Sequence, residues 1–420
     1  MLNKPGQGPG ETRNLIIALA LGAVIIFGWD HFLAKPQRDA RMQEAAVAEQ
    51  QQQERPAVVS REQALESSAG ARVPIDTPSV DGTILLTGGR FDDLNLRRYR
   101  QTIDPDSAEV TLLEPTDTAH AQDAFFGWEE RDARYAGVGA SDTWTLAEGT
   151  RLTPQTPIVL TLTTGDGLEV RRTISVDENF MFTVADAVRN VSDAPREVRP
   201  FGAVRREGLP PTFRGQQIVH QGMVGVFGPE PRLHEERYEN AEKHARDKTR
   251  GKAGEDERIL ELSGPGGWLG LGDHYWLTAM IPAQEENISA YYDASPDGDQ
   301  SLFRAAYRGD WRTIQPGQEV TYTQRLFAGA KRVDLLRQYQ RDLSIPDFDK
   351  AVDWGFLFFF TRPFFAMLDF FGKFAGNFGL GILMATVVIK VFLFPIVYQS
   401  NMAMAKLRKV QPKMKEIQER

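Results

Sequence analysis

The sequence predicts a multi-pass membrane protein in which helical membrane segments flank one large antiparallel β-sandwich. Apolar runs lie near both ends of the 420-residue chain, and many short β-prone runs lie between them. The run at 376–400, GNFGLGILMATVVIKVFLFPIVYQS, is longer than the about 20 apolar residues that cross a bilayer. The hydrophobic fraction is an ordinary 41%, so most of the chain lies outside a membrane.

The composition excludes several classes of function. The net charge is −8 and no stretch of domain size is basic, which argues against a nucleic-acid partner. The sequence contains no cysteine, which excludes disulfides, thiol catalysis and zinc–thiolate sites. No nucleotide motif is visible, so we expect no cofactor and no catalytic activity.

The sequence of the N-terminal region predicts a membrane anchor followed by a linker. Residues 1–12 form a polar, cytoplasmic N-terminus, and 13–34 form the first transmembrane helix around the apolar run 15–29. This run has the length of a signal peptide, but no A-x-A cleavage site follows, so an uncleaved anchor is favoured over a removed signal. Residues 35–72, with the polar run QEAAVAEQQQQERP, form a disordered linker.

Residues 73–343 predict the sandwich. Strands are expected near 83–87, 110–113, 144–146, 158–162, 169–174, 180–184 and 320–323. Gly, Pro, Asp and Asn punctuate these runs, as expected of an antiparallel sandwich. The dense mixed-charge run 230–258 is interpreted as a solvated loop or hairpin arm, and a helix over 333–342 closes the domain.

Residues 344–374 predict an amphipathic helix that lies in the membrane interface. The stretch from Trp354 is rich in phenylalanine, including Phe359, at helical spacings. Arg362 and two later charges interrupt it, so it is a poor third span, and Pro363 can begin a new helical turn. The alternative is an ordinary core helix of the outer domain.

The second transmembrane helix, 375–399, contains one charge, Lys390. A charge inside a span costs about 2.5–3.5 kcal/mol on insertion scales. Thr386 lies one helical turn earlier, so the two side chains share a face. Two interpretations stay open: the lysine snorkels to the headgroups, or it lines a polar cavity that is open to the cytoplasm and attracts polar parts of a client chain. Pro395 is expected to bend the helix.

The basic residues set the orientation. Six of them follow the second span: Lys406, Arg408, Lys409, Lys413, Lys415 and Arg420. Only Arg362 and Lys373 precede it closely, so 400–420 is cytoplasmic and the sandwich lies outside, which means the periplasm in a Gram-negative cell. The tail is interpreted as a solvated positive flank, with contact to anionic lipid or ribosomal RNA as the alternative.

Five stretches, in order, resemble one family. They are RNLIIALALGAVIIFGW (13–29), GGWLGLGDHYWLTAMIP (266–282), VDWGFLFFFTRPFFAML (352–368), GNFGLGILMATVVIKVFLFPI (376–396) and MAKLRKVQPKMKEIQER (404–420). Together they resemble the YidC/Oxa/Alb family of bacterial membrane protein insertases. The resemblance covers nearly the whole chain.

The resemblance implies an insertase and chaperone of the inner membrane, involved in protein transport, that helps nascent membrane proteins insert and fold. It implies a periplasmic β-supersandwich, an interfacial helix, and five spans forming a hydrophilic groove open to the cytoplasm and lipid. The implied partners are nascent membrane proteins, the ribosome, the Sec translocon and the lipid bilayer, without a nucleotide. The family continues with a cytoplasmic helical hairpin, which 400–420 would begin, and with further spans, so the chain is expected to be C-terminally truncated.

The resemblance also assigns the groove residues. Lys390 holds the position where many bacterial members carry arginine, and Thr386 would be a second groove residue. Lysine keeps the positive charge but lacks the planar fork of arginine, which puts bidentate carboxylate binding in doubt.

A membrane-tethered periplasmic carbohydrate-binding or mutarotase-like protein is the alternative function. It would need a convergent His/Glu pair in a cleft. His234 and Glu235 begin an H-E-x-x-H metal motif, but Tyr238 stands where the second histidine should be, so no metal site is predicted. A structural envelope adaptor, the third possibility, would not explain Lys390 within a span.

Overall fold

A computed structural model describes residues 58–418, except 212, 214–218, 255, 299 and 356. The predicted cytoplasmic N-terminus (1–12), the uncleaved anchor (13–34) and most of the linker lie outside the described residues. The chain divides into two compact units, which meet between Ala351 and Val352. The first unit contains the β-sheets, and the second contains two helices.

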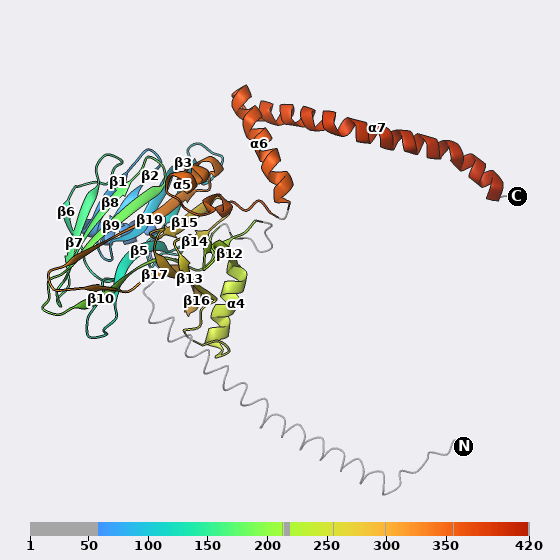
Figure 1. Cartoon of the computed structure of the whole chain (residues 1–420). Helices are drawn as coiled ribbons and strands as arrows, with labels where there is room; N and C mark the ends of the chain where they lie inside the picture. Colours follow the sequence, from blue (N-terminus) through green and yellow to red (C-terminus); the bar gives the residue numbers. More distant parts are fainter. Residues whose placement is uncertain are drawn as a thin grey trace, which may run out of the picture. The chain divides into compact units, whose positions relative to one another are not determined.

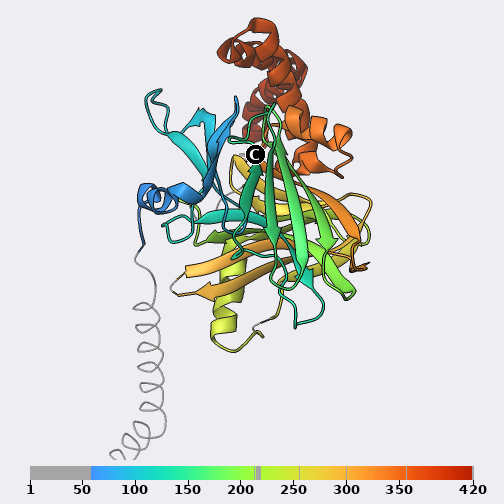
Figure 2. The same ribbon diagram turned by 90° about the vertical axis from the view of Figure 1, so that its left-hand side faces the viewer.

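Two antiparallel sheets make up the first unit (Figures 1 and 2). Within the described residues, one sheet has ten strands: the order β1 (Arg72–Asp76), β2 (Val80–Leu85), β3 (Arg90–Arg100), β5 (Gln122–Glu130), β10 (Arg196–Glu207), β17 (Gln300–Gly309), β16 (Asn287–Asp297) and β13 (Leu260–Pro265), with β4 (Glu109–Leu113) paired to β3 and β18 (Arg312–Ile314) to β10. The other has nine: β12 (Arg232–Arg237), β11 (Gly222–Phe227), β14 (Trp268–Gly272), β15 (Trp276–Ile281), β19 (Glu319–Ala330), β9 (Met181–Asn190), β8 (Leu168–Val176), β7 (Ile158–Thr163) and β6 (Thr145–Glu148). The predicted antiparallel β-sandwich is therefore confirmed.

Aromatic side chains from the two sheets meet in the core. The ring centroids of Phe91 on β3 and Phe182 on β9 are 5.2 Å apart, and the rings meet edge to face. Trp128 on β5 and Tyr322 on β19 make a similar contact at 6.2 Å. Such large buried rings supply much of the apolar area that holds two sheets together.

An ion pair lies fully buried in this core. Asp186 accepts hydrogen bonds from Arg172 Nε at 2.7 Å and Nη2 at 2.8 Å, and from Trp128 Nε1 at 2.9 Å. Arg172 and Asp186 side chains are 0% exposed. The guanidinium also donates to the carbonyl of Phe126 and lies 4.4 Å from the ring centre of Trp144. The buried pair thus makes four hydrogen bonds, three of them to the carboxylate of Asp186.

The ordered domain begins earlier than residue 73. A short helix, α3 (Arg61–Ser67), lies in the stretch expected to be a linker, and a short 3₁₀ turn, η2 (Ala69–Ala71), joins it to β1. Ser60 and Gln63 form a capping box at its start, which satisfies two of the free backbone N–H groups. Arg61 pairs with Asp93 of β3 and so holds the helix to the sheet.

The mixed-charge run 230–258, interpreted as a solvated loop or hairpin arm, is a hairpin arm only in its first part, where β12 pairs with β11 at the edge of its sheet. The prediction missed helix α4 (Tyr238–Thr249), which forms the next part of the run. Although most residues of α4 are polar or charged, one side of the helix forms an apolar stripe. The buried residues of α4 are Tyr238, Ala241, Ala245 and Lys248. The ammonium of Lys248 lies 2.7 Å from a carboxylate oxygen of Asp293 on β16. Helix α4 accordingly lies along β16 and β17 (Figures 1 and 2).

The helix predicted over 333–342 is confirmed as α5 (Val333–Asp342). The next stretch, however, still belongs to the sandwich. Pro346 accepts a hydrogen bond from Trp268 Nε1 at 3.0 Å, and Phe348, in the 3₁₀ turn η3 (Phe348–Ala351), packs against the same indole. Residue 344 therefore does not begin an interfacial helix, since 345–351 are tied to the sheet by these contacts.

Candidate functional site

A tight turn joins the two helices of the second unit, α6 (Phe358–Ala375) and α7 (Phe378–Gln418). Gly376 ends α6 with φ of 63°, a left-handed conformation that glycine adopts at little cost. The side-chain oxygen of Asn377 accepts hydrogen bonds from the N–H groups of Gly379 and Leu380 and so caps α7. The sequence GN at this point therefore ends one helix and begins the next.

Helices α6 and α7 approach each other at two glycines. A Cβ placed on Gly381 would lie 2.7 Å from the backbone nitrogen of Gly372 and 2.8 Å from its Cα. Ala385, one turn further along α7, is only 1% exposed. Small residues at such a crossing allow two backbones to pack closely, as is common between membrane helices.

Replacing Gly381 by valine is expected to separate the two helices, because the added atoms would overlap backbone rather than a movable side chain. Overpacking of this kind costs about 1–3 kcal/mol. Since the chain has no cysteine, nitroxides at Phe374→Cys and Leu383→Cys report the helix separation by pulsed EPR. We expect a longer and broader distance distribution in Gly381→Val. Leu380→Val, at an exposed neighbouring position, is the matched control and should leave the distribution unchanged.

Helix α7 contains the candidate span. Within the part of the chain that the structure describes, it is the one helix long and apolar enough to cross a membrane, over Phe378–Met404. The helix continues without a break through Pro395 to Gln418 and extends far beyond α6 (Figure 1). Nearly all of its described side chains after Ala385 are exposed, as expected of a helix whose neighbours are lipid.

Lys390 and Thr386 lie on the side of α7 that α6 leaves open. Lys390 is nine residues from Gly381, which at about 100° per residue places it on the opposite side of the helix. Both side chains are exposed. Thr386 Oγ1 donates to the carbonyl of Ile382 at 2.8 Å, so the hydroxyl oxygen remains free to accept.

A shallow depression of about 320 Å³ lies beside this lysine. It is lined by Val387, Lys390, Val391 and Phe394. The ring of Phe394 stacks on Tyr398 one turn later, with centroids 6.1 Å apart. One cation among apolar walls can bind a polar or acidic group that is itself attached to an apolar chain.

The four residues predicted for the interface lie apart from this face, in and before α6. Trp354 precedes the helix; its ring meets Phe365 edge to face at 5.4 Å, and the guanidinium of Arg362 lies 5.6 Å from its centre. Pro363 lies within α6 and Phe359 is 57% exposed. None of the described side chains of α6 is buried.

The charges that interrupt the phenylalanine-rich sequence of α6 share one face of the helix. Arg362, Asp369 and Lys373 are spaced by seven and four residues, so they lie within about 40° of each other around the helix. Asp369 and Lys373 also form an ion pair at 2.7 Å. The rest of the surface carries exposed phenylalanines: Phe358, Phe359, Phe360, Phe364, Phe365, Phe370 and Phe374. A single polar stripe on an aromatic helix suits the membrane interface.

Four histidines of the sandwich have structural contacts, and the fifth, His120, is exposed. His220 Nε2 lies 3.0 Å from the carbonyl oxygen of Met223, His234 packs on Phe227, His244 Nε2 lies 3.1 Å from the carbonyl oxygen of Glu257, and His274 packs on Tyr275. Burial lowers the pKa of His234 below its usual value. Within the described residues, no three His, Asp or Glu side chains are grouped to hold a metal ion.

The fold and the helix pair define a class: a large β-sandwich followed by a membrane helix that carries a charge within its apolar stretch. The family model described as YidC periplasmic domain matches residues 72–367, and the model described as 60Kd inner membrane protein matches 370–420. The chain belongs to the YidC family. These descriptions place the protein in the inner membrane with the sandwich in the periplasm.

Relatives from two bacteria illustrate the similarity, and both are named membrane protein insertase YidC. The protein of Rhizobium meliloti is 38% identical over 433 residues, which cover 98% of this chain and 70% of the relative. The protein of Methylorubrum extorquens is 37% identical over 443 residues, with the same coverage of 98% and 70%. These relatives and the family models support the predicted membrane protein insertase function, and they do not favour the carbohydrate-binding alternative.

Among solved structures, a galactose mutarotase-related enzyme from Lactobacillus acidophilus matches 61% of this chain and 97% of its own chain. The TM-score is 0.37 at 11% identity, which is too low to support an argument about function.

Proposed function

We propose that this chain acts as a membrane protein insertase and chaperone for nascent inner-membrane proteins, and that the Lys390–Thr386 face of α7 contacts the client. One observation carries the assignment of this face. Lys390 is an exposed charge within the apolar stretch of a candidate span, on the side that α6 leaves open. Charges at such positions are costly, and they usually face a polar cavity or a partner.

The chemistry of the face fits this role. The ammonium of Lys390 offers three donors and a point charge, and the hydroxyl of Thr386 offers an acceptor. A client's polar or acidic groups can exchange water for these contacts, which lowers the desolvation barrier to entering the membrane. The client's apolar segment then moves into lipid, driven by burial of its apolar surface. No step of this scheme needs a nucleotide.

The remaining elements complete the proposal. We assign the first span to 13–34 and the second to 375–399, α6 to the periplasmic interface, and 400–420 to the start of a cytoplasmic hairpin, in a multi-pass protein. Six basic residues after the second span support the cytoplasmic assignment of the tail. A basic helical tail at this place also suits contact with the ribosome, and the family resemblance supports action beside the Sec translocon.

Deleting most of the sandwich, residues 73–330, tests the proposed function. An insertase whose client face lies on α7 is expected to keep most of its insertion activity, because the face is retained. The readout is protease protection of a newly inserted single-span client in membranes that contain the parent or the deletion variant at equal amounts. Complete loss of insertion at equal amounts would move the function to the sandwich.

A further inference from the structure

The two ends of the sandwich are far apart and chemically different. Strand β19 connects them: its first residue, Glu319, pairs with Arg189, and its last, Ala330, pairs with Trp276. Twelve residues of strand separate these ends by about 36 Å. We call the end at Trp276 the exit end, because the chain leaves the sandwich there, and the end at Arg189 the far end.

The chain leaves the sandwich at the exit end. Helix α5 begins beside the β14–β15 turn, where the N–H of Lys331 donates to the carbonyl of Tyr275. It then crosses to the β8–β9 turn, where the hydroxyl of Tyr339 donates to Asp177. Phe348, near the end of the domain, packs on Phe327, three residues before the end of β19. The segment that leads to α6 and α7 therefore starts near this end.

An aromatic cluster, Tyr99, His274, Tyr275 and Trp276, occupies the exit end. Tyr275 is 64% exposed. Its ring lies 4.2 Å from His274 and 6.0 Å from Trp276, and Trp276 lies 5.0 Å from Tyr99. The exposed Arg98 adds positive charge nearby, whereas Arg332 is paired with Asp334 at 2.8 Å. Tyrosine and tryptophan beside arginine are typical of membrane–water interfaces.

Buried contacts fix the turn that presents this cluster. Asp273 accepts a hydrogen bond from Arg206 Nη2 at 2.9 Å, and both side chains are nearly fully buried. The N–H of Asp273 donates to the carbonyl of Trp276, which closes the turn. A buried ion pair contributes little net stability, so its consequence here is to hold Tyr275 in an exposed position.

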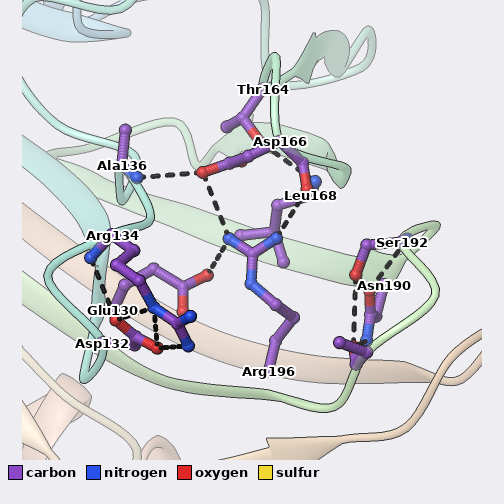
Figure 3. A network of polar contacts seen from close by, with 11 residues as sticks. Glu130, Asp132, Arg134, Ala136, Thr164, Asp166, Leu168, Asn190, Ser192 and Arg196 are labelled. Atoms are coloured by element: carbon purple, nitrogen blue, oxygen red, sulfur yellow. Dashed lines mark hydrogen bonds and ion pairs between the residues drawn. The ribbon is translucent and has the colours of Figure 1, made fainter.

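The far end carries a dense charged network (Figure 3). Two rings at this end are covered by guanidinium groups: Arg196 lies 3.8 Å from the ring centre of Tyr135, and Arg199 lies 4.3 Å from that of Trp311. Arg196 Nη2 lies 2.6 Å from Glu130 Oε1, and Arg196 Nη1 donates to the carbonyl of Asp166 at 2.8 Å. Asp132 and Arg134 pair beside them, and the Arg134 side chain is 79% exposed. Burial raises the pKa of Glu130, although Arg196 acts in the opposite direction. Placing these charged groups against lipid would cost a large desolvation free energy.

We propose that the aromatic cluster contacts the headgroup layer of the periplasmic leaflet, so that the sandwich stands with its exit end on the membrane. The rings of Tyr275 and Trp276 would supply interfacial contacts, and Arg98 would attract lipid phosphates. The far end, with the Arg196 network, points into the periplasm. This proposal rests on the periplasmic placement of the domain and not on the proposed client face.

Site-directed spin labelling in liposomes of phosphatidylcholine and phosphatidylglycerol tests the proposal. The whole chain, with a single nitroxide at Arg98→Cys beside the intact aromatic cluster, is compared with Val191→Cys, which is 47% exposed at the far end. The measured quantity is the nitroxide's collision rate with oxygen divided by its collision rate with a water-soluble nickel chelate. We expect this ratio to be at least about twofold higher at the exit end, because oxygen concentrates in lipid.

Two further variants keep the result interpretable. Tyr275→Ser, added to Arg98→Cys, is expected to lower that ratio toward the Val191→Cys value, because the aromatic anchor is lost. Asp273→Asn, added to Arg98→Cys, is expected to lower it by releasing the turn that presents Tyr275. Equal ratios at the two ends would overturn the proposal. So would shielding of the Arg98→Cys nitroxide from both reagents, which would indicate protein contact in place of lipid.

Discussion

Replacing Asp186 by asparagine is expected to destabilise the sandwich by about 3–5 kcal/mol, because it leaves the buried guanidinium of Arg172 without a counter-charge. The substitution keeps the volume, so packing of the neighbouring rings changes little. It removes the carboxylate that accepts two hydrogen bonds from Arg172 and one from Trp128. Urea unfolding of the whole chain in detergent, followed by tryptophan fluorescence, measures the loss.

Two comparisons separate the buried charge from other effects. Arg172→Met combined with Asp186→Leu removes both charges and is expected to be more stable than Asp186→Asn alone. Glu148→Gln breaks an exposed pair with Arg171 and should cost about 0–1 kcal/mol. A double variant as unstable as Asp186→Asn, or an Asp186→Asn variant as stable as Glu148→Gln, would contradict the role assigned to the pair.

Replacing Lys390 by leucine is expected to slow insertion of a client with an acidic translocated tail by about tenfold. A tenfold loss corresponds to about 1.4 kcal/mol, roughly half of the about 2.5–3.5 kcal/mol that a charge costs within a span. Lys390→Arg keeps the charge and should stay within about twofold of the parent. The readout is the rate at which the tail becomes protected from protease added outside the vesicles.

The control for this series is Phe392→Leu. Phe392 is 78% exposed and lies two residues from Lys390, about 200° around the helix, on the opposite side. It should leave the insertion rate unchanged. If the lysine only snorkels to the headgroups, Lys390→Leu will insert clients at the parental rate, and the client face proposed here is then wrong.

Much of the sandwich could be predicted because strand and turn signals are local. The buried Arg172 had a readable signal as well: Val170, Arg172 and Ile174 share one face of β8, and that face is buried. Helix α4 was missed because its many charges obscure the Ala241 and Ala245 stripe, which shows only when the sequence is placed on a helical period.

The candidate site could be predicted in part. The i, i+4 spacing of Thr386 and Lys390 puts them on one face in any helix. Which way that face points depends on the approach of Gly381 to Gly372, a tertiary contact that no local pattern specifies. The aromatic cluster at the exit end was not predicted, since Tyr99 and Trp276 meet across strands that are distant in sequence.

Photo-crosslinking from Thr386 tests the client face most directly. A photoreactive amino acid is placed at Thr386 or at the matched position Phe392, and the membranes receive a ribosome-stalled client at successive chain lengths. We expect crosslinks to the client from Thr386 at intermediate lengths, when it is partly inserted, and far fewer from Phe392. Equal crosslinking from both positions, or crosslinks from Thr386 to lipid alone, would contradict the assignment of Lys390 and Thr386 to a client-binding face.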